Sequence, residues 1–216
     1  MKSLDCKPDI HSANPACNVR GLLLLFNGMD TEKILKVIKS ADSPLKRQLL
    51  IVGLVTKVLE QRGKDIPTVI GGCALSYYSR EVYFTSDIDL AYSDREALDE
   101  VLSEIGFDRE GKYWVNKGLK IAIEVPAGVL VGEDSPAEIV ELGENLRCRI
   151  IGIEDLVIDR LNACKYWKSE IDCEMVELLL ARYLKEMDWA YLEKKAGMPE
   201  NNSLSELAEL RRKAEK

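Results

Sequence analysis

Two aspartates one residue apart, Asp87 and Asp89, are the residues of this chain best suited to chemistry. In a β-strand alternate side chains share a face, so the two carboxylates would stand together while Ile88 and Leu90 point into a core. Carboxylates that close repel each other unless a cation lies between them, and hard oxygen ligands suit Mg²⁺. The pair therefore predicts a metal site on a strand; the alternative is two solvated acids at an exposed strand end.

Two glycines, Gly71 and Gly72, precede these aspartates and follow the short β-branched run 68–70. Glycines between a strand and a helix can leave backbone N–H groups free to bind phosphate. The same glycines could instead serve only a tight strand-to-helix connection. Phosphate beside a metal indicates phosphoryl or nucleotidyl transfer.

A third carboxylate, Glu124, interrupts an apolar stretch between Ile123 and Val125. If this strand lies beside the Asp87–Asp89 strand, three carboxylates converge, which is enough to hold two Mg²⁺ ions together with substrate phosphates and water. In two-metal transfer one ion lowers the pKa of the attacking hydroxyl, and the other neutralises the phosphates and the leaving group. A salt bridge from Glu124 to a surface lysine or arginine is the alternative.

In this order, Gly71-Gly72, Asp87-Ile88-Asp89-Leu90 and Ile123-Glu124-Val125 resemble the nucleotidyltransferase (DNA polymerase β-like) superfamily. The resemblance implies a small mixed sheet flanked by helices. It also implies transfer of a nucleoside monophosphate from an NTP to a hydroxyl, with Mg²⁺ and release of pyrophosphate. Arg80 and Thr85, between the glycines and the aspartates, resemble the minimal branch of that superfamily and are expected to contact the nucleotide.

The helical stretch 154–165 resembles a further motif of the abortive-infection AbiEii-type toxin nucleotidyltransferases. There a basic residue of the helix reaches the nucleotide, and Lys165 is the corresponding position here. We expect Asp159 and Arg160 of the same helix to form a structural charge pair. The resemblance extends over about residues 68–185 and implies a role as the toxin of a two-gene system as one biological setting.

The chain departs from the family pattern in three ways. Many members have Gly-Ser where this chain has Gly71-Gly72, so backbone N–H groups must replace a hydroxyl contact to phosphate. The gap from the glycines to the aspartates is long, and many members have aspartate in place of Glu124. These differences motivate a second hypothesis, a catalytically silent member that binds nucleotide as a sensor or scaffold.

Aromatic residues gather between the glycines and the aspartates, at Tyr77, Tyr78, Tyr83 and Phe84. Their rings could stack on a base, but packing within the helix and the following loop is the interpretation we prefer. For Arg80 in the same segment, pairing with an acid explains the residue as well as nucleotide contact does.

The composition is typical of a globular protein, with 216 residues, 46% of them hydrophobic and 31% charged. A net charge of −7 argues against strong non-specific binding to nucleic acid, although a tRNA end held in a cleft is compatible with it. We therefore leave the acceptor open among an RNA 3′ end, a protein hydroxyl and a small molecule. The sequence contains no run of about eighteen apolar residues, the length that a membrane span needs, and we expect a cytoplasmic protein.

The six cysteines form no CxxC pair, and most have apolar neighbours, so we expect reduced thiols that pack in the core. A zinc site made of Cys6, His11 and Cys17 is disfavoured, because the spacing matches no standard site and a fourth ligand is lacking.

The order of elements predicts an α/β (α+β) fold, in which a small mixed sheet flanked by helices precedes a helical C-terminal subdomain. We expect an N-terminal arm over 1–28, a nucleotidyltransferase core over 29–151 and helices over 152–216. Met29 is a plausible alternative start to Met1, since a helix begins beside it. Periodicity and turn residues predict helices over 30–38, 44–62, 73–79 and 93–105, and strands over 68–70, 87–91, 113–115, 119–125, 138–142 and 147–151. In the second helix Ser43 is the expected N-cap with Pro44 at the first helical position, and a capping box at Ser93 is expected to open the fourth.

Overall fold

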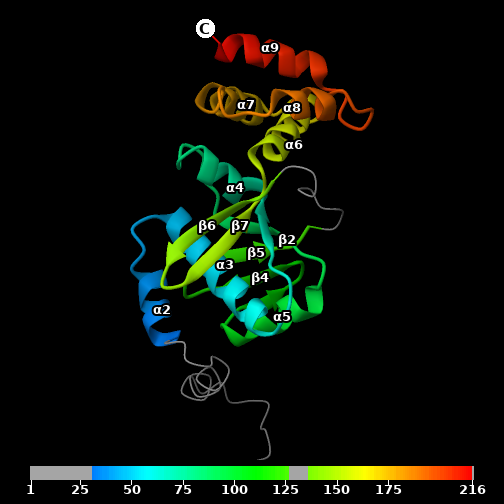
Figure 1. Ribbon diagram of the computed structural model, residues 1–216. Helices are drawn as coiled ribbons and strands as arrows, with labels where there is room; N and C mark the ends of the chain where they lie inside the picture. The colour runs from blue at the N-terminus through cyan, green and yellow to red at the C-terminus, as the bar shows by residue number, and fades with distance from the viewer. Residues whose placement is uncertain (1–30, 127–135, 216) are drawn as a thin grey trace, which may run out of the picture.

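The computed structural model of the protein describes residues 31–126 and 136–215, and confirms the predicted mixed α/β class (Figure 1). Within these residues eight helices accompany one seven-stranded sheet. The strands are β1 (Thr68–Ile70), β2 (Asp87–Ala91), β3 (Asp108–Glu110), β4 (Tyr113–Asn116), β5 (Ile121–Glu124), β6 (Glu138–Gly143) and β7 (Leu146–Ile150). The helices are α2 (Thr31–Lys39), α3 (Pro44–Gln61), α4 (Gly71–Tyr78), α5 (Arg95–Glu104), α6 (Ile153–Tyr166), α7 (Glu170–Arg182), α8 (Trp189–Ala196) and α9 (Leu204–Ala214).

The sheet is mixed and has the strand order β3-β4-β5-β2-β1-β7-β6. The strand β2 lies at its centre, parallel to β5 and antiparallel to β1. This register pairs Asp89 with Glu124 on one side and with Ile70 on the other. The strand ends that carry the predicted chemistry are therefore neighbours in space.

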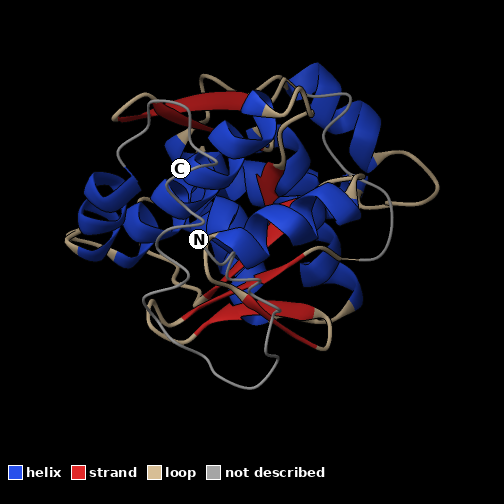
Figure 2. Ribbon diagram, turned by 90° about the horizontal axis from the view of Figure 1, so that it is seen from below, coloured by secondary structure: helices blue, strands red, loops and turns tan. Residues whose placement is uncertain are grey.

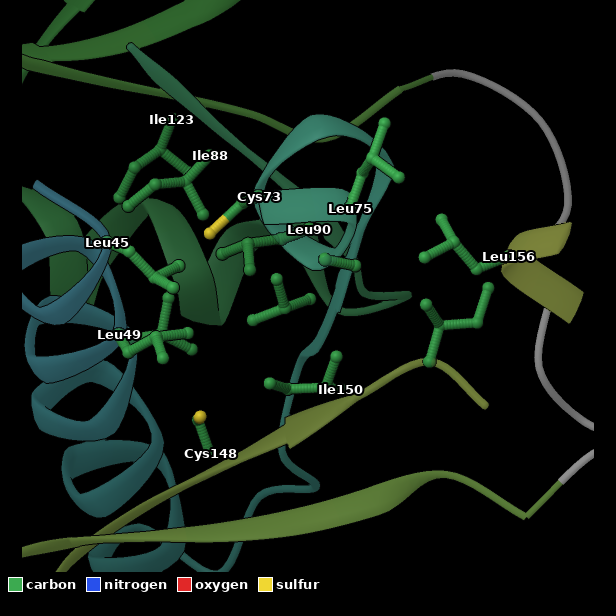
Figure 3. Packing of buried hydrophobic residues seen from close by; sticks show 14 of the residues in the cluster. Leu45, Leu49, Cys73, Leu75, Ile88, Leu90, Ile123, Cys148, Ile150 and Leu156 are labelled. Atoms are coloured by element: carbon green, nitrogen blue, oxygen red, sulfur yellow. The ribbon is translucent and has the colours of Figure 1, made fainter. Parts of the chain in front are cut away.

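The hydrophobic core lies between the sheet and α3 (Figure 3). Leu45 and Leu49 of α3 face Ile88 of β2 and Ile123 of β5, and the two isoleucines are completely buried. Because strand side chains alternate, the acids of β2 and β5 lie on the opposite face of the sheet from this core. Helices lie along the sheet when the molecule is viewed from below (Figure 2).

The C-terminal helices α6 to α9 gather at one end of the molecule, next to α4 (Figure 1). The helix α7 runs back against α6, and the side chain of Arg182 in α7 donates hydrogen bonds to the carbonyl oxygens of Tyr78 and Ser79 at the end of α4. The helical region is thus attached directly to the helix that begins with the glycine pair. None of the described helices is long and apolar enough to cross a membrane.

Local signals account for most element ends, with some corrections. Ser43 caps α3 by accepting a hydrogen bond from the Lys46 N–H at 3.2 Å, with Pro44 at the first helical position as predicted. The predicted capping box at Ser93 is wrong, because Asp94 is the N-cap of α5 and accepts from the Ala97 N–H at 3.0 Å. A carboxylate caps as well as a hydroxyl and also complements the helix dipole.

Two strand predictions also need correction. The strand β3 was not expected, because its three residues are all exposed and polar and show no alternation. The strand expected over 119–125 is shorter, since Lys120 has a φ of +56°, which is incompatible with an extended strand, and β5 begins at Ile121.

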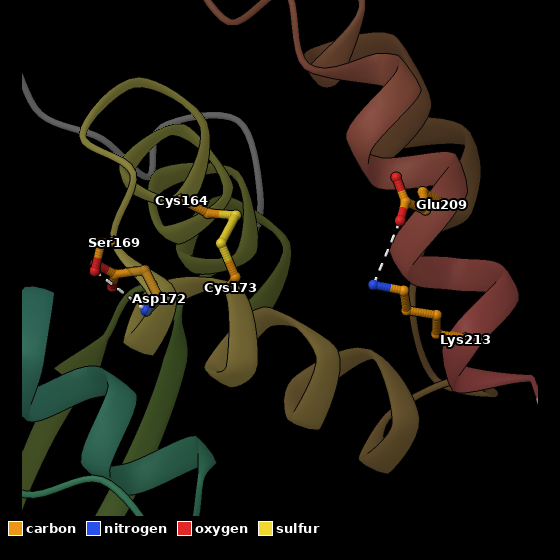
Figure 4. The surroundings of a disulfide bond; sticks show 6 residues. All are labelled: Cys164, Ser169, Asp172, Cys173, Glu209 and Lys213. Atoms are coloured by element: carbon orange, nitrogen blue, oxygen red, sulfur yellow. Dashed lines mark hydrogen bonds and ion pairs between the residues drawn. A yellow bond between two sulfur atoms is a disulfide. The ribbon is translucent and has the colours of Figure 1, made fainter.

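The prediction of reduced core cysteines is confirmed for Cys73 and Cys148, which are buried free thiols. It is wrong for Cys164 and Cys173, which form a disulfide between α6 and α7 (Figure 4). The turn between these helices brings the two Cα atoms to 4.8 Å, a proximity that the nine-residue separation does not reveal without the tertiary fold. The disfavoured zinc site and the N-terminal arm, together with both candidate starts, lie outside the described residues.

Candidate active site on the central strands

The three carboxylates predicted to converge belong to adjacent parallel strands. Asp87 and Asp89 lie on β2, Glu124 lies on β5, and all three residues are partly exposed. The register pairs Asp89 with Glu124 and Asp87 with Ala122. One face of the sheet therefore presents an aspartate pair with a glutamate alongside.

Gly71 and Gly72 form the first turn of α4, which begins two residues earlier than predicted, and this Gly71-Gly72 turn packs directly against Asp89. Gly71 has a φ of +58°, and a Cβ there would overlap Asp89 Oδ2 and lie 3.0 Å from its Cγ. The backbone N–H of Gly72 donates to Asp89 Oδ2 at 3.4 Å. Position 71 therefore requires glycine, because of its positive φ and because an added Cβ would overlap Asp89. The Gly72 N–H, which the sequence pattern assigned to phosphate, points to a carboxylate instead.

Thr85 connects the turn to the first aspartate. Its hydroxyl donates a hydrogen bond to Asp87 Oδ1, and its side chain packs against Gly72. A Cβ at Gly72 would lie 3.1 Å from Thr85 Cβ, so a serine there would crowd Thr85. The departure from Gly-Ser thus has a local explanation, because a neighbouring hydroxyl already occupies this space.

Asp89 carries the electrostatic strain of the site. Burial, the charge of Asp87 and the charge of Glu124 all raise the pKa of Asp89, while the Gly72 N–H and the charge of Arg160 oppose this rise. A carboxylate among like charges is stabilised most effectively by a bound cation. The donors are all hard oxygens, the type that Mg²⁺ prefers, so the residue types fit the predicted metal.

Glu124 has a partner in this structure. Lys112 Nζ lies 2.9 Å from Glu124 Oε1, and the lysine side chain is 65% exposed. The hydrogen bonds with Glu124 and Tyr113 raise the pKa of Lys112 to about 12. The salt-bridge alternative considered for Glu124 is therefore realised, and no three His, Cys, Asp or Glu side chains within the described ranges are grouped closely enough to hold a metal.

Lys165 makes its contacts within the helical region. Its ammonium lies 3.1 Å from Glu206 Oε1 and donates to the carbonyl oxygen of Asn202. The basic residue of α6 whose charge acts on Asp89 is Arg160.

Arg160 forms the structural pair expected with Asp159 and also bonds Asp172 of α7, with Nη1 3.1 Å from Asp172 Oδ1. Sequence reasoning gave it no role at the site. A usable signal was its spacing, because Arg160 follows the buried Leu156 by four residues and the buried Val157 by three and so lies on the apolar side of α6.

The segment between the glycines and the aspartates is irregular and partly exposed. Arg80 and Glu81 both have positive φ, and the exposed Arg80 side chain forms no ion pair with another described residue. Tyr78 is buried, and its hydroxyl donates to the carbonyl oxygen of Ile151 at 2.8 Å, as packing predicts. For Phe84 the packing prediction is wrong, because its side chain is 63% exposed.

Comparison with protein-family models and with curated proteins finds no match to this chain. The interpretation of the site therefore depends on its own residues.

Proposed function

We propose that this protein is a Mg²⁺-dependent nucleotidyltransferase, which moves a nucleoside monophosphate from an NTP to a hydroxyl acceptor and releases pyrophosphate. The observation that carries the proposal is Asp89, a partly buried carboxylate placed between Asp87 on its own strand and Glu124 on the parallel neighbour. Such an arrangement lowers stability unless a cation binds, so its presence in an otherwise well-paired structure favours a functional role.

Asp87 and Asp89 would hold the metal, and Glu124 would join them after leaving Lys112. When bound, Mg²⁺ would neutralise the phosphates and lower the pKa of the acceptor hydroxyl. Thr85 orients Asp87 through its hydroxyl, and the Gly71-Gly72 turn allows backbone to approach the metal and the phosphates. The Glu124 carboxylate is the group available to accept the proton of the acceptor hydroxyl.

Cationic residues around the aspartates would bind the nucleotide phosphates. Arg80 is exposed at the end of α4. Lys165 is a second candidate, but it would first have to leave Glu206. Arg160 lies close enough to Asp89 to influence it electrostatically, so it is a third candidate, with two carboxylates competing for its guanidinium.

Label transfer tests the proposal. Purified protein is incubated with each α-labelled NTP, Mg²⁺ and a cell extract, and transfer of label to macromolecules and small molecules is measured. We expect transfer that Asp89→Ala reduces by about 10³-fold, the scale of losing an essential electrostatic group. Asp42→Ala, a change at an exposed acid of the loop before α3, is the control and should retain full transfer. Equal transfer by the wild type and Asp89→Ala contradicts the proposal.

A second candidate is a catalytically silent nucleotide sensor of the same fold. It is favoured by the partners already present in the site, Lys112 on Glu124 and the Gly72 N–H on Asp89. Lys112→Met separates the two candidates. In an enzyme the substitution should increase transfer at limiting Mg²⁺ by roughly two- to five-fold, because it frees Glu124 to bind the metal. The effect is small because an exposed ion pair contributes little free energy. A sensor binds NTP with Mg²⁺ and shows no transfer with either lysine or methionine at this position.

A toxin role would be a biological use of the same chemistry in the cytoplasm. Expression should then arrest growth, Asp89→Ala should abolish the arrest, and a neighbouring gene should relieve it. Growth arrest that persists in Asp89→Ala would separate toxicity from nucleotide transfer.

A further inference from the structure

A cavity of about 170 Å³ opens where β2 and β5 begin, beside the start of α3. Its walls include Arg47 and Gln48 of α3, Phe84 and Thr85 before β2, and Lys120 before β5. Thr85 is also the residue whose hydroxyl donates to Asp87. The cavity therefore shares a wall with the carboxylate site.

The charge of this cavity is opposite to that of the protein. Two cationic residues, Arg47 and Lys120, line it together with neutral residues only, although the whole chain has a net charge of −7. Neither cation forms an ion pair within the part of the chain that the structure describes, and Arg47 Nε is buried there without a hydrogen-bond partner. A buried donor without an acceptor costs free energy, which a bound anion near the guanidinium offsets.

The position of this cavity is set by the backbone. Gln48 is buried, and its side-chain amide donates to the carbonyl oxygen of Thr85 at 3.0 Å, which fixes α3 to the segment before β2. Lys120 has a φ of +56°, and the backbone turns there just before β5. Arg47 and Lys120 therefore approach one cavity from elements far apart in the sequence.

Phe84 adds an aromatic surface to the same cavity. Its side chain is 63% exposed, although a phenylalanine of a folded domain is usually buried. Cationic groups that bind phosphate and an exposed ring that stacks on a base are the two components of single-stranded nucleic-acid sites. A cavity of this size offers contacts to one phosphate and to one base at its rim, and not to a long strand.

We propose that this cavity, formed by Arg47, Lys120 and Phe84, binds a nucleotide residue of the acceptor, which is the end of a single-stranded nucleic acid. Arg47 and Lys120 bind its phosphate, and Phe84 stacks on its base. This inference rests on the proposed function, which requires an acceptor, and it narrows the acceptor to a nucleic-acid end. A one-nucleotide footprint also agrees with the acidic net charge, because affinity for a long backbone would need many more cations.

Binding of a fluorescent single-stranded RNA hexamer, measured by anisotropy without turnover, tests the inference. The double variant Arg47→Met/Lys120→Met should bind at least ten-fold more weakly than the wild type. Its plot of log Kd against log salt concentration should be shallower by about 0.7, since the two residues contact one phosphate and each phosphate contact to a single strand contributes about 0.7. Phe84→Ala should weaken binding by about ten-fold through loss of stacking.

Matched controls change the same residue types outside the cavity. Lys46→Met removes an exposed cation next to Arg47 that pairs with Asp42, and Val82→Ala trims an exposed apolar residue near Phe84. Both should bind the hexamer within two-fold of the wild type. Arg47→Lys keeps the charge and should retain most of the binding. This variant provides the test where Arg47→Met misfolds.

Several results would overturn the inference. They are absence of hexamer binding by the wild type, equal weakening by the control variants, or inorganic phosphate competing fully with the hexamer while Phe84→Ala has no effect. Loss of Mg²⁺–NTP binding in Arg47→Met/Lys120→Met would assign the cavity to the donor instead. Failure of the proposed function looks different, because it abolishes label transfer while hexamer binding and its dependence on Phe84 persist.

Discussion

Two of the carboxylate clusters in the described part of the protein, one on the sheet and one between α6 and α7, are built in opposite ways. On the sheet, Asp87 and Asp89 lie beside Glu124, and the exposed Lys112 is paired with the glutamate. Between α6 and α7, one mostly buried arginine, Arg160, holds both Asp159 and Asp172.

The pKa directions express this difference. Burial and like charge raise the pKa of Asp89, which disfavours its charged form. Burial opposes the charge of Arg160, but the carboxylates of Asp159 and Asp172 outweigh it and raise the pKa of the guanidinium. The helical cluster stabilises the fold by itself, whereas the sheet cluster reaches its best state only with a cation, which is the property of a site.

The largest effect on stability is expected from Arg160→Met. The substitution keeps an apolar stem but leaves the carboxylate of Asp172, whose side chain is only 14% exposed, without its cation. Removing one partner of such a pair should lower the free energy of unfolding by about 3 kcal/mol, measured by urea denaturation.

An exposed two-carboxylate cluster is the control for this prediction. Arg211 bonds Glu193 and Glu215 on α8 and α9 in the same one-to-two arrangement, but nearer the surface. Arg211→Met should lower the free energy of unfolding by about 1 kcal/mol at most. Equal losses at the two arginines would mean that burial does not distinguish the clusters.

The disulfide reinforces the helical cluster next to Asp172. Replacing Cys164 and Cys173 by serine removes a crosslink across nine residues and should lower the free energy of unfolding by about 2.5 kcal/mol. Denaturation with and without dithiothreitol checks it, with Cys73→Ser as a control that tests thiol chemistry without a crosslink. A wild-type midpoint unaffected by dithiothreitol, with all six cysteines of the chain titrating as thiols in denaturant without reductant, would show that the bond does not form.

The glycine turn on the sheet side should respond to a single methyl group. Gly71→Ala forces alanine into a left-handed conformation and against Asp89, so it should lower the free energy of unfolding by about 2–3 kcal/mol. Gly63→Ala is the matched control, because Gly63 has a φ of +68° with nothing within 4 Å of an added Cβ. It should cost about 1 kcal/mol from the backbone alone. The difference measures the contact with Asp89, and equal losses would mean that Asp89 moves aside freely.

Much of the sheet cluster could be predicted from local pattern. The alternation in Asp87–Leu90 and around Glu124 has the period of a strand with one buried face, and both strands form where that period predicts. Fold class follows from the order of such elements. What the pattern could not give is register, because pairing of β2 with β5 depends on the whole sheet rather than on either strand.

The partners of the site residues were beyond prediction for the same reason. Lys112 reaches Glu124 because β4 pairs Tyr113 opposite Glu124, a relation set by the register of a hairpin. The disulfide depends on α7 folding back onto α6. The exposure of Phe84 depends on which other elements of the fold pack over it. Tertiary placement decides each of these, whereas the residue types alone suggest several partners.

Replacing one carboxylate by an amide should have opposite effects on stability in the two clusters. Asp89→Asn keeps an oxygen that accepts from the Gly72 N–H but removes the charge that Asp87 and Glu124 repel, so it should raise the free energy of unfolding at neutral pH without Mg²⁺. The sign follows from linkage, since the folded-state pKa of Asp89 lies above its ordinary value of 3.8 and the folded state therefore binds more protons in that window. Wild-type stability relative to the variant should thus decrease as the pH rises through the window between 3.8 and the raised pKa, and the two proteins should converge below it.

Asp172→Asn should have the opposite sign, because it removes half of an ion pair with Arg160. Urea denaturation of the three proteins across acidic and neutral pH measures both effects. If Asp89→Asn destabilises the metal-free protein as much as Asp172→Asn does, then Asp89 is a structural residue and the two clusters do not differ in kind.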